Sequence, residues 1–199
     1  MFVLTIDQRG SRRDVDRVPT LLSQLSGGRG VLRGFERTVG DEVQGVVPDA
    51  AAAVELALTV LRTGGWSVGI GAGPVDEPLP LEARAGTGAA FVLARRAVER
   101  AKSRQRPVPV AVEGRRADRA AEAEAVLTLV AAVAARRTEG GWAAVDAWRA
   151  AEGRGTQEEI AGRLGVSQQA VSQRLAAALW DEEWAVRPVV ARLLEEAQG

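Results

Sequence analysis

Two aspartates, Asp7 and Asp41, stand where carboxylates could hold a metal ion. Asp7 ends the apolar run FVLTI (2–6), which is typical of a strand, and Asp41 follows Gly40 in RTVGDEVQGVV (37–47), where Gly-Asp is typical of a hairpin turn. If the strand and the hairpin are neighbours in a sheet, both carboxylates lie at one edge, beside which Mg²⁺ or Mn²⁺ and a nucleotide phosphate could bind. Taken singly, each aspartate is also compatible with a plain turn or a strand-end cap.

The loop after Asp7 has residues suited to holding phosphate groups. It turns at Gly10 and Ser11, whose backbone N–H groups could cradle phosphate oxygens, with Arg12 next to them. The chain has no cysteine and no histidine, which excludes thiol and imidazole chemistry and zinc sites built from these residues. Any metal would therefore be held by carboxylates, which suit Mg²⁺ or Mn²⁺.

Length and charge leave the partners open. The 199 residues are enough for one medium domain or two small ones, and 26 basic residues balance 26 acidic ones. No stretch approaches the roughly 18 consecutive apolar residues that span a membrane. The N-terminus MFVLTIDQRG lacks the basic segment of a signal peptide. We expect a cytoplasmic protein without a membrane partner.

The pattern of elements changes along the chain. Strand-like runs alternate with helical ones up to about residue 113, and this order predicts one sheet with helices packed on one face, an α+β sandwich. Beyond Gly114 the strand-like runs stop and alanine-rich helical segments follow, beginning with 117–137 and 141–153. We therefore expect an α+β domain at 1–113 and an all-α domain at 114–199.

The segment GTQEEIAGRLGVSQQAVSQRLAAALW (155–180) predicts a helix-turn-helix. Thr156 and Glu159 fit a capping box, Gly165 permits the turn, and Ser167 can cap the second helix. The spacing resembles the helix-turn-helix of sigma-factor region 4, which implies that the second helix enters the major groove of DNA. A plain helical hairpin with polar residues facing water is the alternative.

The helix-turn-helix interpretation defines a set of DNA contacts and a homodimer. The residues expected at DNA are Thr156, Gln157, Ser167, Gln168, Gln169, Ser172, Gln173 and Arg174. Residues 114–199 contain 11 basic and 13 acidic residues, so phosphate attraction must be local and a monomer should bind modestly. A homodimer on two half-sites of a double-stranded operator would compensate. The last helix (182–197) has an apolar face for such a contact, and we expect Pro188 to interrupt or kink it.

Four segments resemble the catalytic domain of class III nucleotidyl cyclases. They are DQRG (7–10), RTVGD (37–41), VGIGAG (68–73) and LARR (93–96), in the order found in that family. The resemblance implies a ferredoxin-like or cyclase-palm α/β sandwich with Asp7 and Asp41 as metal ligands. It implies that Arg37 helps to select the purine and that Arg95 or Arg96 approaches the phosphates. Together with the loop after Asp7, the residues expected at the nucleotide are Gly10, Ser11, Arg12, Arg37, Gly40 and Arg95.

The cyclase catalytic set is incomplete in this sequence. Cyclases carry an asparagine one turn before the helix arginine, where this chain has Ala90, Phe91 and Val92, and LEARAG (81–86) offers no second purine-selecting acid. We therefore assign no catalytic residue. Over nearly its full length the chain resembles the SatD-like family, through its D-x-x-G-S, GDE-x-QG and GIG-x-G segments and its TQEEIA-to-SQRL segment.

These observations give one leading hypothesis and two alternatives. The leading hypothesis is a DNA-binding transcription regulator whose degenerate cyclase-like domain senses a nucleotide or cyclic nucleotide. The first alternative is an active metal-dependent nucleotidyl cyclase or cyclic-nucleotide synthase. The second is a regulator whose cyclase-like domain serves only as a dimerisation scaffold.

Overall fold

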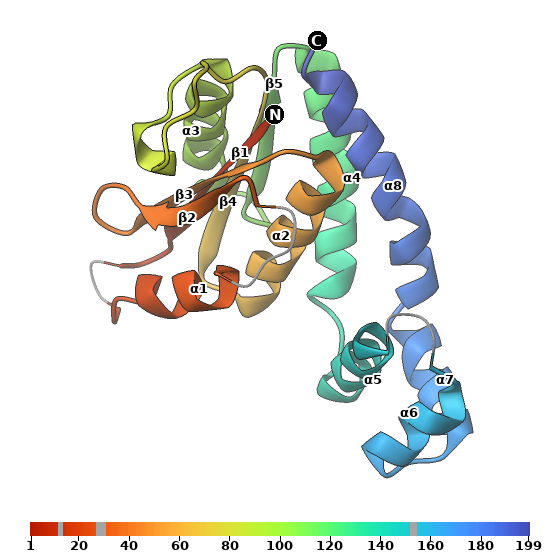
Figure 1. Ribbon diagram of the computed structural model, residues 1–199. Helices are drawn as coiled ribbons and strands as arrows, with labels where there is room; N and C mark the ends of the chain where they lie inside the picture. Colours follow the sequence, from red (N-terminus) through yellow and green to blue (C-terminus); the bar gives the residue numbers. More distant parts are fainter. Residues whose placement is uncertain (12–13, 27–30, 152–154) are drawn as a thin grey trace. The chain divides into compact units, whose positions relative to one another are not determined.

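The computed structural model describes residues 1–11, 14–26, 31–151 and 155–199 (Figure 1). They form two compact units, one made of Met1–Ala131 with Arg187–Gly199 and the other of Ala132–Val186. Residue 114, the boundary expected from the sequence, lies inside the first unit, which also contains most of helix α4 (Ala117–Ala134) and the end of α8 (Trp180–Ala197). Among the described residues, no helix has the length and apolar character needed to cross a membrane.

The first unit is built on a five-stranded mixed sheet in the order β2-β3-β1-β4-β5. The strands are β1 (Phe2–Gln8), β2 (Arg33–Arg37), β3 (Glu42–Val47), β4 (Trp66–Ala72) and β5 (Val110–Gly114). The central strand β1 runs antiparallel to both β3 and β4, β2 runs antiparallel to β3, and β5 runs parallel to β4. The mixed sheet with its helices confirms an α+β architecture.

Local signals explain two of these connections. The β2–β3 hairpin forms as expected, with Arg37 opposite Val43 and Gly40 at a φ of 64° in the turn, a conformation that glycine adopts without strain. Helix α2 (Ala50–Thr63) begins after Asp49, whose carboxylate accepts a hydrogen bond from the Ala52 N–H at 2.7 Å. The capping satisfies a backbone donor that the first helical turn leaves unpaired.

Helices cover both faces of the sheet. Figure 1 shows α3 (Ala89–Ala101) on the opposite face from α1 (Val18–Leu25) and α2. Every residue of β3 and β4 is buried, as expected for strands covered on both sides. The expectation that all helices pack on one face was therefore wrong. The alternation in β4, with Val68 and Ile70 on one side and glycines on the other, gives each face a surface on which a helix packs.

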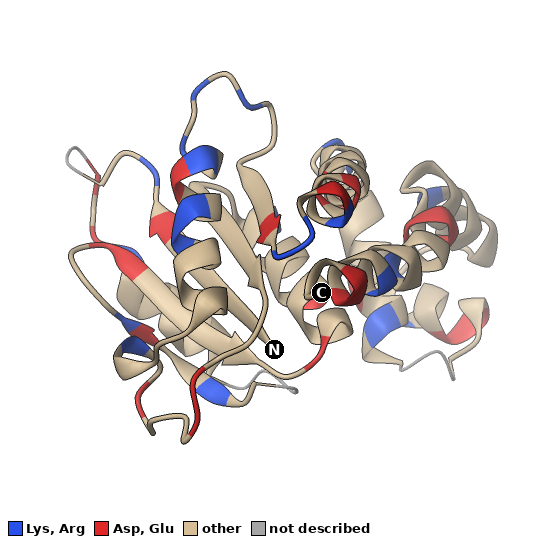
Figure 2. Ribbon diagram, turned by 90° about the horizontal axis from the view of Figure 1, so that it is seen from above, with Lys and Arg blue, Asp and Glu red and all other residues tan. Residues whose placement is uncertain are grey.

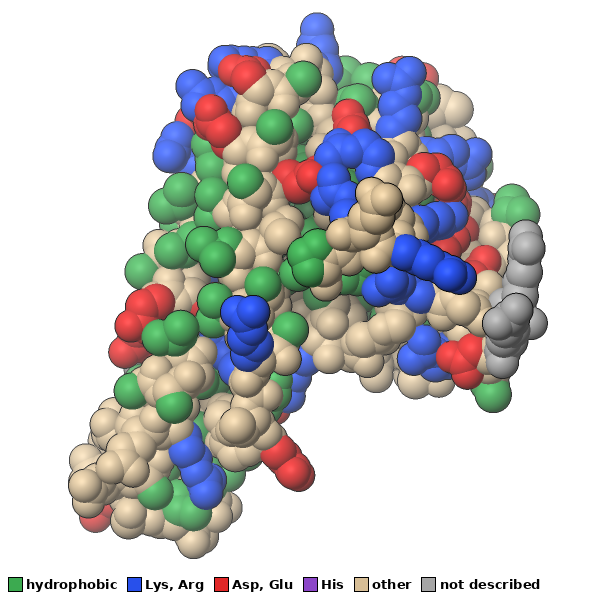
Figure 3. All heavy atoms as spheres, turned by 180° about the vertical axis from the view of Figure 1, so that it is seen from behind, with side chains coloured by type: hydrophobic (Ala, Val, Ile, Leu, Met, Phe, Trp, Pro, Cys, Tyr) green, Lys and Arg blue, Asp and Glu red, His purple; other side chains and the backbone are tan. Residues whose placement is uncertain are grey.

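Charged residues of both signs are interspersed on the exposed elements. Figure 2 shows them mainly on helices and loops, while the strands carry few. On the face seen in Figure 3, Lys and Arg side chains lie among acidic ones. This arrangement agrees with the zero net charge of the chain and gives neither sign a general field.

The remaining elements are helical. They are α4, α5 (Glu139–Ala150), α6 (Gln157–Leu164), α7 (Gln168–Ala177) and α8. An interruption or a kink was expected at Pro188; helix α8 contains this residue and continues through it without interruption. Proline removes one backbone donor, and buried residues on either side of it, Trp180 before and Val190 and Leu194 after, hold the helix in place.

Candidate functional site

The end of β1 brings polar side chains together on the face of the sheet that α3 covers. Asp7 lies opposite Glu42 of β3 and Ser67 of β4 in the two ladders that flank β1. Residues paired across antiparallel strands share a face. Val3 lies four residues before Asp7 in β1, hence on the same face, and it packs in a cluster with Ala94 of α3. The sheet thus positions a row of carboxylate and hydroxyl groups beside the C-terminal end of α3.

Asp7 forms an ion pair with Lys102, which follows the last residue of α3. The Lys102 Nζ lies 2.9 Å from Asp7 Oδ2 and 2.8 Å from Glu99 Oε1. Burial raises the pKa of the Asp7 carboxyl, Lys102 works against that rise, and the negative charges of Asp41 and Glu42 add to it. Burial by itself would lower the pKa of Lys102, but the contacts with Glu99 and Asp7 raise it overall. Lys102 therefore stays charged at neutral pH.

A pocket of about 640 Å³ opens at this position. It is lined by Asp7, Gln8, Arg9, Gly10, Ser11, Ser67, Lys102 and Arg104. Gly10 has a φ of 78°, which turns the chain away from β1. Three of the lining residues are cationic and one is acidic, so the pocket has the charge of an anion site.

Some residues expected at a nucleotide line this pocket and others do not. Gly10 and Ser11 line it together with Asp7, and Asp41 lies close enough to act on the Asp7 carboxyl. Gly40 is exposed at the tip of the hairpin, and neither it nor Arg37 or Arg95 is part of the lining. Arg12 lies outside the described residues.

The two arginines outside the lining have carboxylate partners. Arg37 donates to both oxygens of Asp16, at 2.8 and 2.6 Å, and this bond lowers the pKa of Asp16. Arg95, on α3, lies 3.3 Å from Glu42 Oε1, and the same oxygen accepts a hydrogen bond from the Thr38 hydroxyl at 2.7 Å. Both guanidinium groups would have to leave these partners to reach a ligand in the pocket.

The surroundings of Asp7 bear on its expected role as a metal ligand. Asp7 already has a cation at hydrogen-bond distance, the Lys102 ammonium. A divalent ion on Asp7 would have to displace that lysine or crowd it, which costs Coulomb energy. In this arrangement the cation at the Asp7 carboxylate is the Lys102 ammonium.

The glycines of VGIGAG have a packing role. A Cβ added to Gly69 would lie 2.2 Å from the backbone N of Val98, and one added to Gly71 would lie 2.1 Å from the backbone O of Ala90. Both atoms belong to α3. These glycines therefore allow the backbone of α3 to pack closely against β4. Neither glycine lines the pocket.

In the second unit, α6 and α7 form a capped helix-turn-helix. The Thr156 hydroxyl accepts from the Glu159 N–H at 3.2 Å and the Glu159 carboxylate accepts from the Thr156 N–H at 2.9 Å, which confirms the capping box. Gly165 adopts the left-handed conformation that ends α6. Ser167 caps α7 by accepting from the Ala170 N–H at 3.2 Å.

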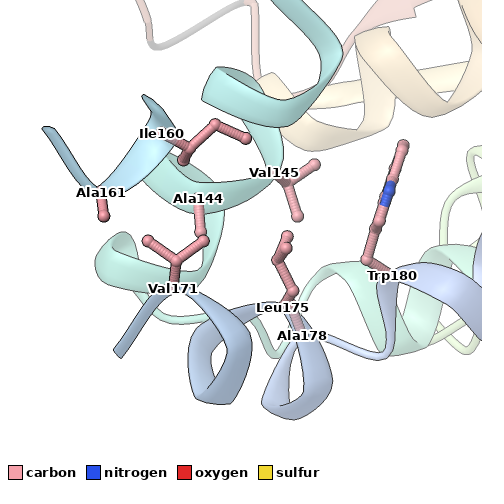
Figure 4. Close-up of a cluster of buried hydrophobic side chains, with 8 residues drawn as sticks. All are labelled: Ala144, Val145, Ile160, Ala161, Val171, Leu175, Ala178 and Trp180. Carbon is pink, nitrogen blue, oxygen red and sulfur yellow. The ribbon is translucent and has the colours of Figure 1, made fainter. Parts of the chain in front are cut away.

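A hydrophobic cluster holds this motif together (Figure 4). It consists of Ala144, Val145, Ile160, Ala161, Val171, Leu175, Ala178 and Trp180. Figure 4 shows these side chains from α5, α6 and α7 converging, with Trp180 at one side. Trp142 and Trp148 pack against the cluster as partly buried residues, whereas Trp184 is 57% exposed with its ring 5.4 Å from that of Trp180. The helices that must position α7 therefore share one core.

The outer face of α7 is polar and accessible. Ser167, Gln168, Gln169, Ser172 and Gln173 are exposed, and Arg174 is partly exposed. On α6, Thr156 is exposed and Gln157 partly so, although the Thr156 hydroxyl is engaged in its cap. Gln173 and Arg174 also line a hollow of about 240 Å³ beside the start of α5. All the residues expected at DNA thus lie on or next to these two helices with surface that a partner could reach.

The cap at the start of α6 gives a direct test of this local structure. We expect Thr156→Ala to lower the stability of the second unit by about 1 kcal/mol, because the Glu159 N–H loses its acceptor. Urea unfolding followed by tryptophan fluorescence measures the change. Ser172→Ala removes an exposed hydroxyl from the neighbouring helix and should leave the unfolding midpoint in place. Equal midpoints for the two variants would contradict the cap.

Three pocket residues could not be found by pattern in the sequence. Lys102, Arg104 and Ser67 come from segments far from DQRG, and only the sheet and α3 bring them to it. One signal was available, because Lys102 is the only lysine in a chain whose other basic residues are arginines. Glu42 was visible next to Asp41, but its alignment with Asp7 depends on the register of β1 and β3.

Comparisons with known proteins identify no relative from which a function could be transferred. No protein-family model matches the chain, and searches of curated proteins and of solved structures gave no significant match.

Proposed function

We propose that this protein is a DNA-binding transcription regulator, acting in the cytoplasm as a homodimer, whose N-terminal unit senses a nucleotide. The observation that carries the proposal is the exposed polar face of α7 on a capped helix that shares a core with α5 and α6. A helix presented in this way fits the major groove. A plain helical hairpin has no need of the glutamines that line this face.

The side chains of α7 suit base recognition. Glutamine amides form paired hydrogen bonds with adenine, and arginine forms them with guanine or with phosphate. The acidic residues of the helical region give it no general attraction for DNA, so the affinity of one motif would be modest. A homodimer that presents two copies of α7 to two half-sites supplies the rest.

The N-terminal unit supports the nucleotide part of the proposal. Its elements β1-α1-β2-β3-α2-β4, with the strand order β2-β3-β1-β4, follow the ferredoxin-like arrangement that we propose for it, of the cyclase-palm type. Its cationic pocket lies at the end of β1, next to the loop expected to cradle phosphates. A nucleotide bound there would regulate DNA binding if it favoured the DNA-competent state.

The DNA-binding proposal is tested at α7. We expect the double substitution Gln169→Ala with Gln173→Ala to weaken binding to the preferred duplex by about 30-fold or more, because each lost amide contact is worth at least about 1 kcal/mol. The duplex is selected from a random-sequence pool with the full-length protein, and binding is measured by fluorescence anisotropy at fixed salt.

The control is a double substitution of exposed glutamines in the first unit. Gln24 lies on α1 and Gln105 follows α3, and both are exposed. Gln24→Ala with Gln105→Ala should bind the same duplex as tightly as the unmodified protein. If the α7 variant binds as tightly as this control, α7 is not the recognition helix. If no duplex is enriched from the pool, the protein is not a sequence-specific regulator.

A further inference from the structure

The pocket at the end of β1 has cationic groups that the fold leaves free. Arg9 and Arg104 both line it and both are exposed. Neither guanidinium group forms a hydrogen bond or an ion pair with any residue in the described part of the chain. Most other arginines of this unit, among them Arg37, Arg100 and Arg106, are paired with a carboxylate. Arg9 and Arg104 are therefore available to an external anion.

Lys102 pairs with two carboxylates and also lines the pocket. Its ammonium has three N–H donors, of which Asp7 and Glu99 take two at 2.9 and 2.8 Å. The side chain is 33% exposed and lines the pocket, so the third donor can reach a ligand. The two carboxylates fix the position of the ammonium group and keep it charged.

A buried hydroxyl in the pocket lacks a partner. Ser67 is 0% exposed, and its Oγ atom is buried. It forms no hydrogen bond with the described residues, although it lies opposite Asp7 in the β1/β4 ladder. Buried hydroxyls are nearly always hydrogen-bonded, because an unpaired one costs free energy. An oxygen atom of a ligand in this pocket would satisfy it.

These groups together define the chemistry of the ligand. The pocket of about 640 Å³ is lined by three cations, by the Ser67 hydroxyl that lacks a partner, and by the Gly10–Ser11 turn with its hydroxyl and backbone groups. A phosphate group offers several acceptor oxygens to such a set of donors. The Lys102 ammonium contacts the Asp7 carboxylate, at the position that the ion of a metal-dependent site would occupy.

We propose that this pocket binds the phosphate group of a nucleotide directly through Lys102, Arg9 and Arg104, with the lysine in place of a divalent cation. The inference deepens the nucleotide-sensing part of the proposed function and rests on it for the nucleoside portion of the ligand. It does not depend on DNA binding by α7. Asp7 acts here as the residue that positions Lys102, and it is not a metal ligand.

The test measures binding of defined probes to the full chain with and without metal. Isothermal titration calorimetry is carried out with the 5′-monophosphates and 5′-triphosphates of adenosine and guanosine, with the two nucleosides, and with inorganic phosphate. Each probe is titrated in EDTA and again in Mg²⁺. We expect at least one nucleotide to bind in EDTA with an affinity that Mg²⁺ does not raise, and its nucleoside to bind at least about tenfold more weakly. If inorganic phosphate is the only probe that binds, the pocket is assigned to free phosphate and the nucleotide assignment is overturned.

Two substitutions connect that binding to the pocket. Arg104→Gln removes an exposed cation with no partner among the described residues, so the fold should be unaffected and the affinity should fall about tenfold. Lys102→Gln should reduce it at least as much, and circular dichroism shows whether losing the Asp7 contact disturbs the fold. Arg115→Gln makes the same charge change in an exposed residue just beyond β5, outside the pocket lining, and should have no effect.

Each remaining outcome decides the question. Binding that requires Mg²⁺ would overturn the role of Lys102 as the cation. An Arg104→Gln variant that binds as well as the Arg115→Gln variant would place the ligand elsewhere. No binding of any probe at millimolar concentration would overturn the pocket itself. Measuring the selected DNA duplex with the same samples separates these results from a failure of the α7 proposal.

Discussion

The substitution Gly71→Ala is expected to destabilise the N-terminal unit by about 3 kcal/mol, at the upper end of the range for overpacking a core. The added Cβ would lie 2.1 Å from the backbone O of Ala90 and 2.4 Å from the backbone N of Ala94. Both are backbone atoms of α3, so no side-chain rotation relieves the clash. The helix would have to move away from β4, and with it the Lys102 end of the pocket.

Hydrogen exchange detected by mass spectrometry measures this effect in the right unit. Amides of β4 and α3 should exchange faster in the Gly71→Ala protein, while those of α6 and α7 should keep their protection. Gly34→Ala is the matched control, because a Cβ at Gly34 meets nothing within 4 Å. If the amides of β4 exchange equally slowly in both alanine variants, α3 does not pack against Gly71 as closely as described.

The second large effect is expected at a buried ion pair in the C-terminal unit. Arg137 and Glu183 have side chains only 1% and 3% exposed, with Arg137 Nη2 lying 2.5 Å from Glu183 Oε2. Arg137 also donates from Nε to the backbone O of Ala178 at 2.7 Å and lies over the ring of Trp142 at 4.8 Å. We expect Arg137→Met to cost about 3–5 kcal/mol, because the buried Glu183 charge loses the Arg137 guanidinium group.

A double-mutant cycle distinguishes the charge effect from lost packing. Adding Glu183→Leu to Arg137→Met should recover much of the lost stability, since the buried carboxylate is then removed together with the guanidinium group. Unfolding is followed by tryptophan fluorescence, with Arg163→Met, an exposed arginine of α6, as the control for removing a positive charge. A double variant as unstable as the sum of the single ones would show that the two residues do not interact.

The loss of Arg137 should also affect the helix-turn-helix. Its guanidinium group bonds to the carbonyl of Ala178, the residue that caps the end of α7. A destabilised α7 would present its glutamines in several orientations, so DNA affinity should fall along with stability. This links the folding of the second unit to the proposed function through one buried side chain.

Several features could be predicted because their causes are local. The capping box of Thr156 and Glu159, the turn at Gly165 and the cap at Ser167 each involve groups within a few residues of one another. The hairpin around Gly40 formed for the same reason. The order of strands and helices also followed from hydrophobic periodicity.

Other features depended on contacts between distant segments. Pattern alone did not place α3 on the face opposite α2, because the glycines of β4 are compatible both with ligand approach and with helix packing. The local rule for proline did not predict the uninterrupted α8, which has buried residues on either side of Pro188. The division into two units depended on which helices pack with the sheet.

The sequence by itself determined the α+β architecture, the hairpin that carries Asp41 and the capped motif that presents α7, because propensity, periodicity and capping act over short stretches of chain. Tertiary structure alone decided that Lys102 meets Asp7, that Ser67 is buried opposite that carboxylate without a partner, and that Arg104 joins Arg9 around one pocket. These residues are separated by up to about a hundred positions, and only the register of β1 with its neighbours and the packing of α3 bring them together.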